Sequence, residues 1–148
     1  MSALHDRLQT DLTLARKAQD RPLTLVLGTL LSEIKNKRIE LRRDPSDDEV
    51  VDVVRRGIKK RRESVEMYEQ GGRFDLMEKE QAELAVLERY LPPAVDPAEL
   101  RAAVKAAIAA GATTMGAVMG KVMPQFRGRV EGGAINALAR EELAAAQG

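Results

Sequence analysis

Apolar side chains recur every three or four residues along most of this 148-residue chain. That spacing places them on one face of an α-helix, and no stretch alternates apolar and polar residues for long enough to form a sheet. Residues that break or cap helices divide the pattern into seven segments. The predicted helices span residues 4–18, 22–41, 46–68, 74–91, 97–110 and 115–122, with a last helix through Ile135, Leu138 and Leu143. The sequence therefore predicts an all-α fold.

Several helix starts carry recognisable signals. Ser46 and Glu49 have the spacing of a capping box, in which each side chain bonds the backbone N–H of the other residue. Pro22 and Pro97 stand at first-turn positions, where proline is tolerated. Asp96, just before Pro97, is a favourable N-cap. These residues fix the starts of the second, third and fifth helices.

The pair Pro92-Pro93 coincides with a sharp change of composition. Residues 1–93 contain 18 basic and 18 acidic side chains, whereas residues 94–148 contain 6 and 5 and are rich in Ala and Gly. We therefore predict a domain boundary here. A four-helix, bundle-like domain is expected over residues 1–93, and a small three-helix domain over residues 94–148.

The composition is that of an ordinary globular protein, with 44% hydrophobic residues and a net charge of +1. The absence of cysteine excludes disulfides, thiolate chemistry and Cys-based metal sites. No apolar run approaches the roughly 20 residues that span a membrane, and the N-terminus lacks the apolar core of a signal peptide. We expect a cytoplasmic protein without a membrane partner.

The third helix carries the densest basic cluster of the chain. Its members are Arg55, Arg56, Lys59, Lys60, Arg61 and Arg62. One interpretation is a surface for a phosphate backbone. The other is that the cluster packs beside the acidic fourth helix, whose carboxylates neutralise it in place. The sequence leaves both open and gives the second somewhat more weight.

The apolar periodicity also places three charged residues at core positions. Arg61 falls on the apolar stripe of the third helix, Glu80 on that of the fourth and Arg38 on that of the second. Charged side chains are rarely buried without a partner. We therefore expect a partly buried ion pair between Glu80 and either Arg61 or Arg38, which would fix the register of the helices.

Residues 113–136 combine two helical glycines with a basic turn. Gly116 and Gly120 lie four residues apart, hence on one helix face, and each costs a helix about 1 kcal/mol relative to Ala. We expect them mainly to let a neighbouring helix pack closely. The turn after this helix contains Arg127 and Arg129, which either suit an anion or are simply solvated.

Motifs for catalysis are missing from the sequence. His5, the one histidine, stands at the start of the first helix without a partner in the sequence, so a solvated role is favoured over catalysis. The chain has no histidine–carboxylate metal spacing, no phosphate-binding Gly-Lys-Ser/Thr loop and no serine-nucleophile motif. We expect no catalytic residues, no metal and no cofactor.

Three motifs together resemble the YqeY family. They are Tyr90-Leu91-Pro92 at the end of an acidic helix, Gly71-Gly72-Arg73 before Asp75-Leu76, and Met115-Gly116 with Met119-Gly120-Lys121 and Gly128-Arg129. The resemblance covers essentially the whole chain. It implies an all-α protein whose C-terminal module is similar to the tail of the B subunit of the tRNA-dependent amidotransferase, a region that engages tRNA.

This resemblance implies a role in binding tRNA. Lys121, Arg127 and Arg129 are the tail positions that it marks as candidate contacts. The chain departs from the family at Val130-Glu131-Gly132, where relatives commonly have Ala-Asp-Gly. Glu131 caps a helix less well than Asp, and it places a negative charge beside the proposed phosphate site.

The leading expectation is a non-catalytic, tRNA-associated accessory protein. The tail turn would bind the tRNA, helped by the outward-facing residues Arg55, Lys59 and Arg62. One alternative is an interaction module that docks on an amidotransferase or an aminoacyl-tRNA synthetase. Another is a glutamine-dependent carbon–nitrogen ligase by homology, although the chain has neither the amidase site nor the activating cradle of those enzymes.

Overall fold

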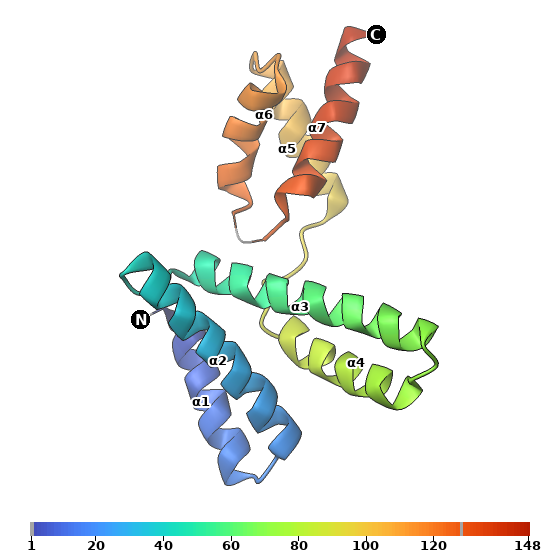
Figure 1. Ribbon diagram of the computed structural model, residues 1–148. Helices are drawn as coiled ribbons and strands as arrows, with labels where there is room; N and C mark the ends of the chain where they lie inside the picture. The colour runs from blue at the N-terminus through green and yellow to red at the C-terminus, as the bar shows by residue number, and fades with distance from the viewer. Residues whose placement is uncertain (1, 128) are drawn as a thin grey trace. The chain divides into compact units, whose positions relative to one another are not determined.

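The computed structural model describes residues 2–127 and 129–148, which form seven α-helices, one short 3₁₀ helix and no strand (Figure 1). The elements are α1 (Ala3–Lys17), α2 (Arg21–Leu41), α3 (Asp47–Gln70), α4 (Phe74–Glu88), α5 (Pro97–Ala109), α6 (Met115–Val122), η1 (Met123–Gln125) and α7 (Gly132–Gln147). The predictions of an all-α fold and of seven helices are confirmed. The 3₁₀ helix, which contains Pro124, is absent from the sequence prediction.

Contacts within the chain divide it into two compact units, Met1–Leu91 and Pro92–Gly148. This division lies within two residues of the boundary predicted after Pro93. That each unit folds independently stays a prediction.

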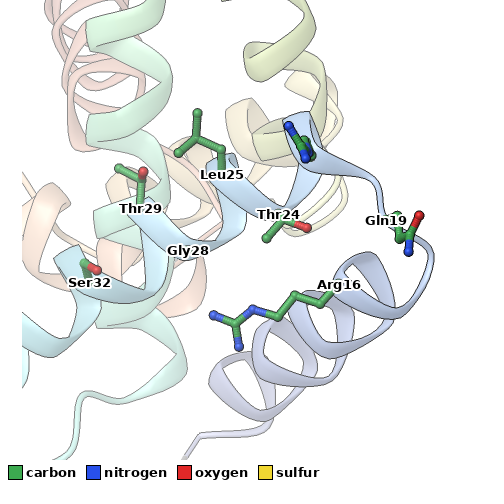
Figure 2. A pocket seen from close by; sticks show the side chains of 8 residues that line it. Arg16, Gln19, Thr24, Leu25, Gly28, Thr29 and Ser32 are labelled. Carbon is green, nitrogen blue, oxygen red and sulfur yellow. The ribbon is translucent and has the colours of Figure 1, made fainter.

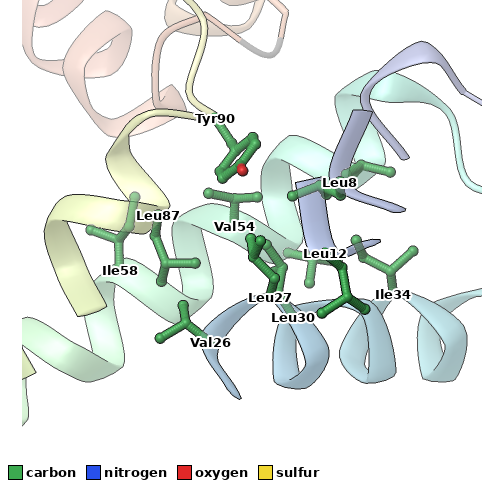
Figure 3. Packing of buried hydrophobic residues seen from close by; sticks show 12 residues of the cluster. Leu8, Leu12, Val26, Leu27, Leu30, Ile34, Val54, Ile58, Leu87 and Tyr90 are labelled. Atoms are coloured by element: carbon green, nitrogen blue, oxygen red, sulfur yellow. The ribbon is translucent and has the colours of Figure 1, made fainter. Parts of the chain in front are cut away.

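The first unit consists of two helical hairpins, α1–α2 and α3–α4, packed around one apolar core (Figures 1 and 3). The contact between α3 and α4 is the most extensive in the chain. Leu8, Leu27, Ile34, Val54 and Leu87 are among its fully buried side chains. Burial of each such side chain contributes about 1.5–3 kcal/mol, so this core is the main source of stability in the unit.

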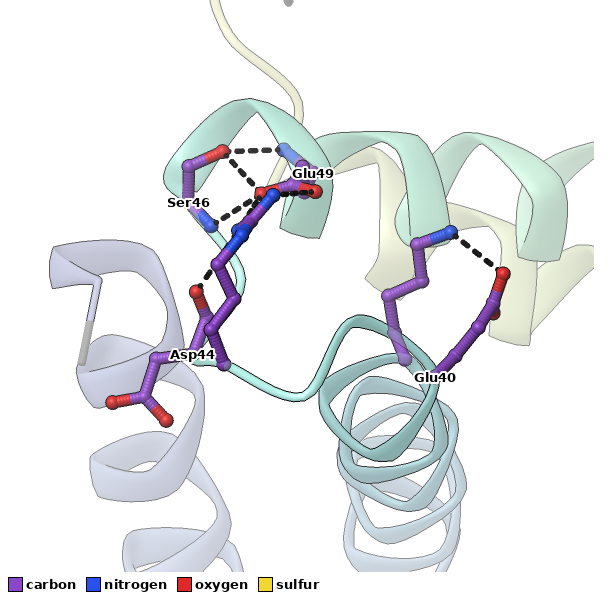
Figure 4. A network of polar contacts seen from close by, with 6 residues as sticks. Glu40, Asp44, Ser46 and Glu49 are labelled. Atoms are coloured by element: carbon purple, nitrogen blue, oxygen red, sulfur yellow. Dashed lines mark hydrogen bonds and ion pairs between the residues drawn. The ribbon is translucent and has the colours of Figure 1, made fainter.

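A network of hydrogen bonds and ion pairs caps the N-terminus of α3 (Figure 4). The backbone N–H of Glu49 donates to Ser46 Oγ at 3.3 Å, and the backbone N–H of Ser46 donates to Glu49 Oε1 at 3.1 Å. The predicted capping box is therefore confirmed. The Arg43 guanidinium binds both oxygens of the Glu49 carboxylate, at 2.6 and 3.0 Å. The start of α1 is joined to the same region, because the backbone N–H of Leu4 donates to Asp47 Oδ1 at 3.0 Å.

This network also determines the ionisation of Glu49. The hydrogen bond from Arg43, and then that from the backbone of Ser46, lower the pKa of Glu49 from 4.5 to about 2. Because the folded-state pKa is depressed, the stabilisation is present above about pH 4.5 and is lost as the pH falls toward 2.

Helices α3 and α4 approach each other closely at Gly57, where α3 has no side chain. A Cβ atom on the buried Gly57 would lie 3.2 Å from Leu87 Cδ1 and 3.4 Å from Arg61 Nη1. One turn further along α3 and one turn back along α4, Arg61 Nε donates to Glu83 Oε2 at 3.3 Å. Both side chains of this ion pair are largely buried, at 15% and 18% exposure.

The predicted ion pair of Arg61 therefore forms with a different partner. In the antiparallel hairpin, the helix turn that faces Arg61 carries Glu83, four residues before Leu87, and not Glu80. Arg38 is also wrong as a buried partner, because its Nε lies 2.9 Å from Asp44 Oδ1 and both side chains are exposed, at 56% and 43%. The apolar periodicity of α3 correctly predicted that Arg61 is largely buried. The periodicity of α4 did not predict which of its glutamates faces Arg61.

Tyr90 joins the end of α4 to α1. Its ring belongs to the core and is 6% exposed, while its hydroxyl donates to Asp11 Oδ2 at 2.6 Å. The Arg7 guanidinium lies 4.7 Å from the ring centroid. Burial, and then the hydrogen bond to Asp11, raise the pKa of Tyr90 to about 12. The tyrosine thus links the two hairpins of the unit.

The second unit has its own core, formed by α5, α6 and α7. Val104, Val118, Val122, Ile135 and Ala139 are almost completely buried in it. Arg101 on α5 forms ion pairs with Glu141 and Glu142 on α7, which join these two helices at the surface. The unit is small, but it buries apolar side chains from all three helices.

The environment of Tyr90 leads to a prediction that absorbance can test. In the variant Tyr68→Phe, Tyr90 is the only tyrosine left of the two in the chain, so phenolate absorbance reports on it alone. We expect a titration midpoint near pH 12 in the folded protein. Because the folded-state pKa lies above the usual value of 10, this stabilisation is complete below about pH 10 and is lost between pH 10 and 12. A midpoint near pH 10 in the folded protein would contradict the buried hydrogen bond.

The contact at Gly57 leads to a second prediction. Gly57→Leu should lower the free energy of unfolding by about 1–3 kcal/mol, because the new side chain would overpack the hairpin. The matched control is Gly116→Leu, at a helical glycine whose Cβ would meet nothing within 4 Å. Chemical denaturation monitored by circular dichroism measures both variants. Equal stability of the two would show that α3 and α4 do not approach closely at Gly57.

Candidate nucleic-acid interface

The exposed face of α6 combines small residues with one positive charge. Gly116, Gly120 and Lys121 are exposed, whereas Val118 and Val122 on the opposite face are fully buried. The helix begins where the backbone N–H of Ala117 donates to the side chain of Thr114 at 3.2 Å. Because Val118 and Val122 anchor the buried face, the glycine face of α6 is presented outward.

The glycines of α6 do not serve the packing expected of them. A Cβ atom built on Gly116 or Gly120 meets no heavy atom within 4 Å. The expectation that they let a neighbouring helix approach is therefore wrong. Each costs the helix about 1 kcal/mol relative to Ala, and the described residues give no packing reason for that cost.

The basic turn follows η1 and keeps its arginines in solvent. Arg127 and Arg129 are exposed, while Phe126 between α6 and α7 is buried at 3% exposure. The Arg129 guanidinium lies 5.9 Å from the Phe126 ring centroid, and the Arg129 backbone N–H donates to the Phe126 carbonyl at 2.9 Å. Phe126 therefore anchors the turn that presents the arginines. Gly128, which belongs to the motif, lies outside the described residues.

Glu131 occupies the N-cap position of α7, but its side chain makes no capping hydrogen bond. The side chain is exposed. This agrees with the expectation that glutamate is a poor cap. The carboxylate stands two residues from Arg129 in the sequence, so it reduces the local positive potential.

The basic cluster of α3 is partly neutralised by α4. Arg61 forms a largely buried ion pair with Glu83, and Arg62 Nη2 lies 3.6 Å from Glu88 Oε1 in an exposed pair. Arg55 is half-buried, and Lys59 is exposed. Of the three predicted contacts on this helix, Arg55, Lys59 and Arg62, only Lys59 combines full exposure with the lack of an ion pair among the described residues.

His5 differs from its expected place in solvent. The residue is 7% exposed, and its Nδ1 atom is buried with no hydrogen-bond partner in the part of the chain that the structure describes. The first turn of α1 is held by Ser2, whose Oγ accepts from the His5 backbone N–H at 3.1 Å. Sequence alone gave no signal for this, because the burial depends on Pro45 and on α2, which line a cavity together with His5.

Metal sites and membrane-spanning helices are absent from the described residues. In residues 2–127 and 129–148, no three His, Cys, Asp or Glu side chains are grouped as a metal ion would require. Within the same ranges, no helix has the length and apolar character needed to cross a membrane.

Comparison with known proteins identifies relatives of the chain. It is 35% identical over 98 residues to "Altered inheritance of mitochondria protein 41, mitochondrial" of Eremothecium gossypii, covering 64% of this chain and 54% of that protein. It is 30% identical over 76 residues to an uncharacterized protein of Schizosaccharomyces pombe, covering 51% and 62% respectively. The chain thus spans about half the length of the curated relatives it matches. One of these relatives is named as mitochondrial, and the cytoplasmic location of this chain stays a prediction.

The family assignment rests on nearly the whole chain. The family model described as Yqey-like protein matches residues 5–143, which include α2 to α6 completely and most of α1 and α7. The chain therefore belongs to the YqeY family.

Proposed function

We propose that this protein is a non-catalytic accessory protein that binds tRNA through its C-terminal unit. The observation that carries the proposal is the tail surface, defined as the exposed residues Gly116, Gly120, Lys121, Arg127 and Arg129. Its three cations are held on one short stretch of chain by the buried side chains of α6 and by Phe126.

Charge and shape support a phosphate ligand at the tail surface. Lys121, Arg127 and Arg129 form no ion pair with any carboxylate in the described part of the chain. Each can therefore bind a phosphate without first breaking an internal contact. The open glycine face allows a sugar–phosphate backbone to come close to the α6 main chain, which a larger side chain would prevent.

The mode of recognition follows from the scarcity of aromatic residues. Only 3% of the chain is aromatic, and Phe126, the ring nearest the tail surface, is buried. Stacking on unpaired bases therefore has little support. Contacts to the phosphates and to the shape of folded RNA are the mode that these side chains suit. On α3, Lys59 is the best placed helper, with Arg55 and Arg62 as secondary members of the proposed contact set.

The glycine face also fits a second candidate, a protein-docking module. Met123, which follows α6, is 43% exposed and would add apolar area to such a contact. The partner would be an amidotransferase or an aminoacyl-tRNA synthetase. A complex that copurifies after nuclease treatment, and that Arg127→Ala with Arg129→Ala leaves intact, would favour docking over tRNA binding.

The tail surface predicts a charge-dependent loss of tRNA affinity. Arg127→Ala combined with Arg129→Ala should weaken binding of native tRNA, and should reduce the slope of log affinity against log salt by about two, since each lost phosphate contact removes about one. Fluorescence anisotropy at several salt concentrations measures both quantities. Lys105→Ala with Arg140→Ala removes the same charge from exposed positions on α5 and α7 of the same unit. If both double variants bind alike, the tail surface is not the contact.

The glycine face predicts opposite effects on stability and binding. Gly120→Leu should maintain or raise the free energy of unfolding. Leucine stabilises a helix by somewhat under 1 kcal/mol relative to glycine, and a Cβ atom at this position would contact none of the described residues. The same change should lower the affinity for tRNA, because the side chain would hold the RNA backbone away. Ala102→Leu, at an exposed position of α5, is the matched control. Equal tRNA affinity of the two variants would remove the glycine face from the interface.

A further inference from the structure

The N-terminal unit carries a groove that the tail surface does not explain. Two cavities of about 880 and 360 Å³ lie along α1 and α2. They share Arg16, Gly28 and Ser32, so they form one continuous groove between the two helices. Figure 2 shows Arg16 extending from α1 toward the stretch of α2 that contains Gly28. We call this feature the α1–α2 groove.

The lining of the α1–α2 groove is basic. It contains Arg16, Arg21, Lys35 and Arg38 and no carboxylate. Arg38 is paired with Asp44 at one end of the groove. Arg16, Arg21 and Lys35 form no ion pair within residues 2–127 and 129–148. In contrast to α3, where α4 supplies carboxylates, this surface keeps its positive charge.

Gly28 has no packing contact with residues 2–127 or 129–148 that would explain a glycine at this position. It lies in the middle of α2, where glycine costs about 1 kcal/mol relative to Ala, and a Cβ atom there would meet nothing within 4 Å. Gly57, by comparison, packs against Leu87, whose Cδ1 would lie only 3.2 Å from a Cβ atom at this position. A side chain at Gly28 would project into the groove, so the glycine keeps the groove open.

His5 lies at one end of the α1–α2 groove, with its imidazole largely enclosed. The residue lines the smaller cavity, is 7% exposed and has a buried Nδ1 atom with no hydrogen-bond partner among the described residues. The nearby Asp6 Oδ1 is 4.0 Å away, which is too far for a hydrogen bond. Because Nδ1 has almost no accessible surface, a ligand in the cavity would not contact it, and the observations that point to a ligand are the charge of the lining and the glycine at position 28.

The length of the α1–α2 groove distinguishes an extended anion from a small one. Arg21 and Arg38 are 17 positions apart on α2, which at about 1.5 Å per residue places their backbones about 25 Å apart. One small anion cannot contact both ends. A polynucleotide carries a phosphate at every nucleotide, and the hydroxyls of Thr29 and Ser32 add the side-chain type that contacts phosphate and ribose.

We propose that the α1–α2 groove binds the sugar–phosphate backbone of RNA, as a second contact surface besides the tail surface. The choice of RNA rests on the proposed function. Its lining contains no Phe, Tyr or Trp, and the imidazole of His5 is only 7% exposed, so the groove contacts the backbone without stacking on bases. An acidic segment of a protein is the competing ligand, and the test separates it from RNA.

The test compares charge reversals on neighbouring positions of the full-length protein. Arg16→Glu with Lys35→Glu reverses two charges in the groove. Lys17→Glu with Lys79→Glu reverses two exposed charges of the same unit that line neither cavity and lie outside the basic cluster of α3. We expect the groove variant to lose at least tenfold in affinity for native tRNA relative to the control variant, at equal net charge. Equal affinities of the two variants would overturn the proposal.

A third variant tests whether a loss of tRNA affinity is caused by misfolding. Gly28→Ala adds one methyl group to the groove and favours the helix, so it should raise the thermal unfolding midpoint while weakening tRNA binding. Thermal unfolding and anisotropy on the same samples measure the two effects. A stabilised Gly28→Ala variant with wild-type affinity would show that the groove does not contact the RNA.

The outcomes separate the α1–α2 groove from the tail surface. If the tail variants lose tRNA affinity and the groove variants match their control, the proposed function stands and the groove proposal fails. If only the groove variants lose affinity, the groove is the RNA site and the tail surface is not. If the groove variant weakens binding of poly-L-glutamate while its tRNA affinity equals the control, the ligand is an acidic protein and RNA is overturned.

Discussion

The close approach of α3 and α4 at Gly57 is the constraint on which the rest of the N-terminal unit depends. With no side chain at this position, Leu87 lies directly against α3, and the adjacent turn pairs Arg61 with Glu83 away from most of the solvent. This register brings Tyr90 at the end of α4 to Asp11 on α1. The two hairpins are thereby tied together, and the surface between α1 and α2 is held in shape.

The helical glycines of this chain fall into two kinds. Gly57 is explained by its neighbours, whereas Gly28, Gly116 and Gly120 each face open space although glycine weakens a helix. Each of these three lies beside cations that have no carboxylate partner among the described residues. We therefore assign them to contacts with another molecule, Gly116 and Gly120 on the tail surface and Gly28 in the α1–α2 groove.

Periodicity predicted the helices, the capping box at Ser46 and the buried position of Arg61, because each depends on residues close together in the sequence. It failed where the answer depends on which turn of one helix meets another, as in the pairing of Arg61 with Glu83 and the burial of His5. It also predicted wrongly that Gly116 and Gly120 allow a neighbouring helix to pack closely. The spacing of two glycines does not show whether they face a helix or solvent. The α1–α2 groove is formed by residues from two helices, so no local pattern marks it.

The reactivity of individual lysines with and without bound tRNA is the most direct measurement of the central claim. Amine labelling of the native protein, followed by mass spectrometry, reports each lysine separately. The account predicts that tRNA protects Lys121 on the tail surface and Lys35 in the α1–α2 groove, while Lys17 and Lys105 stay reactive. Uniform protection of all four, or protection of Lys17 and Lys105 alone, would contradict an interface at these two surfaces.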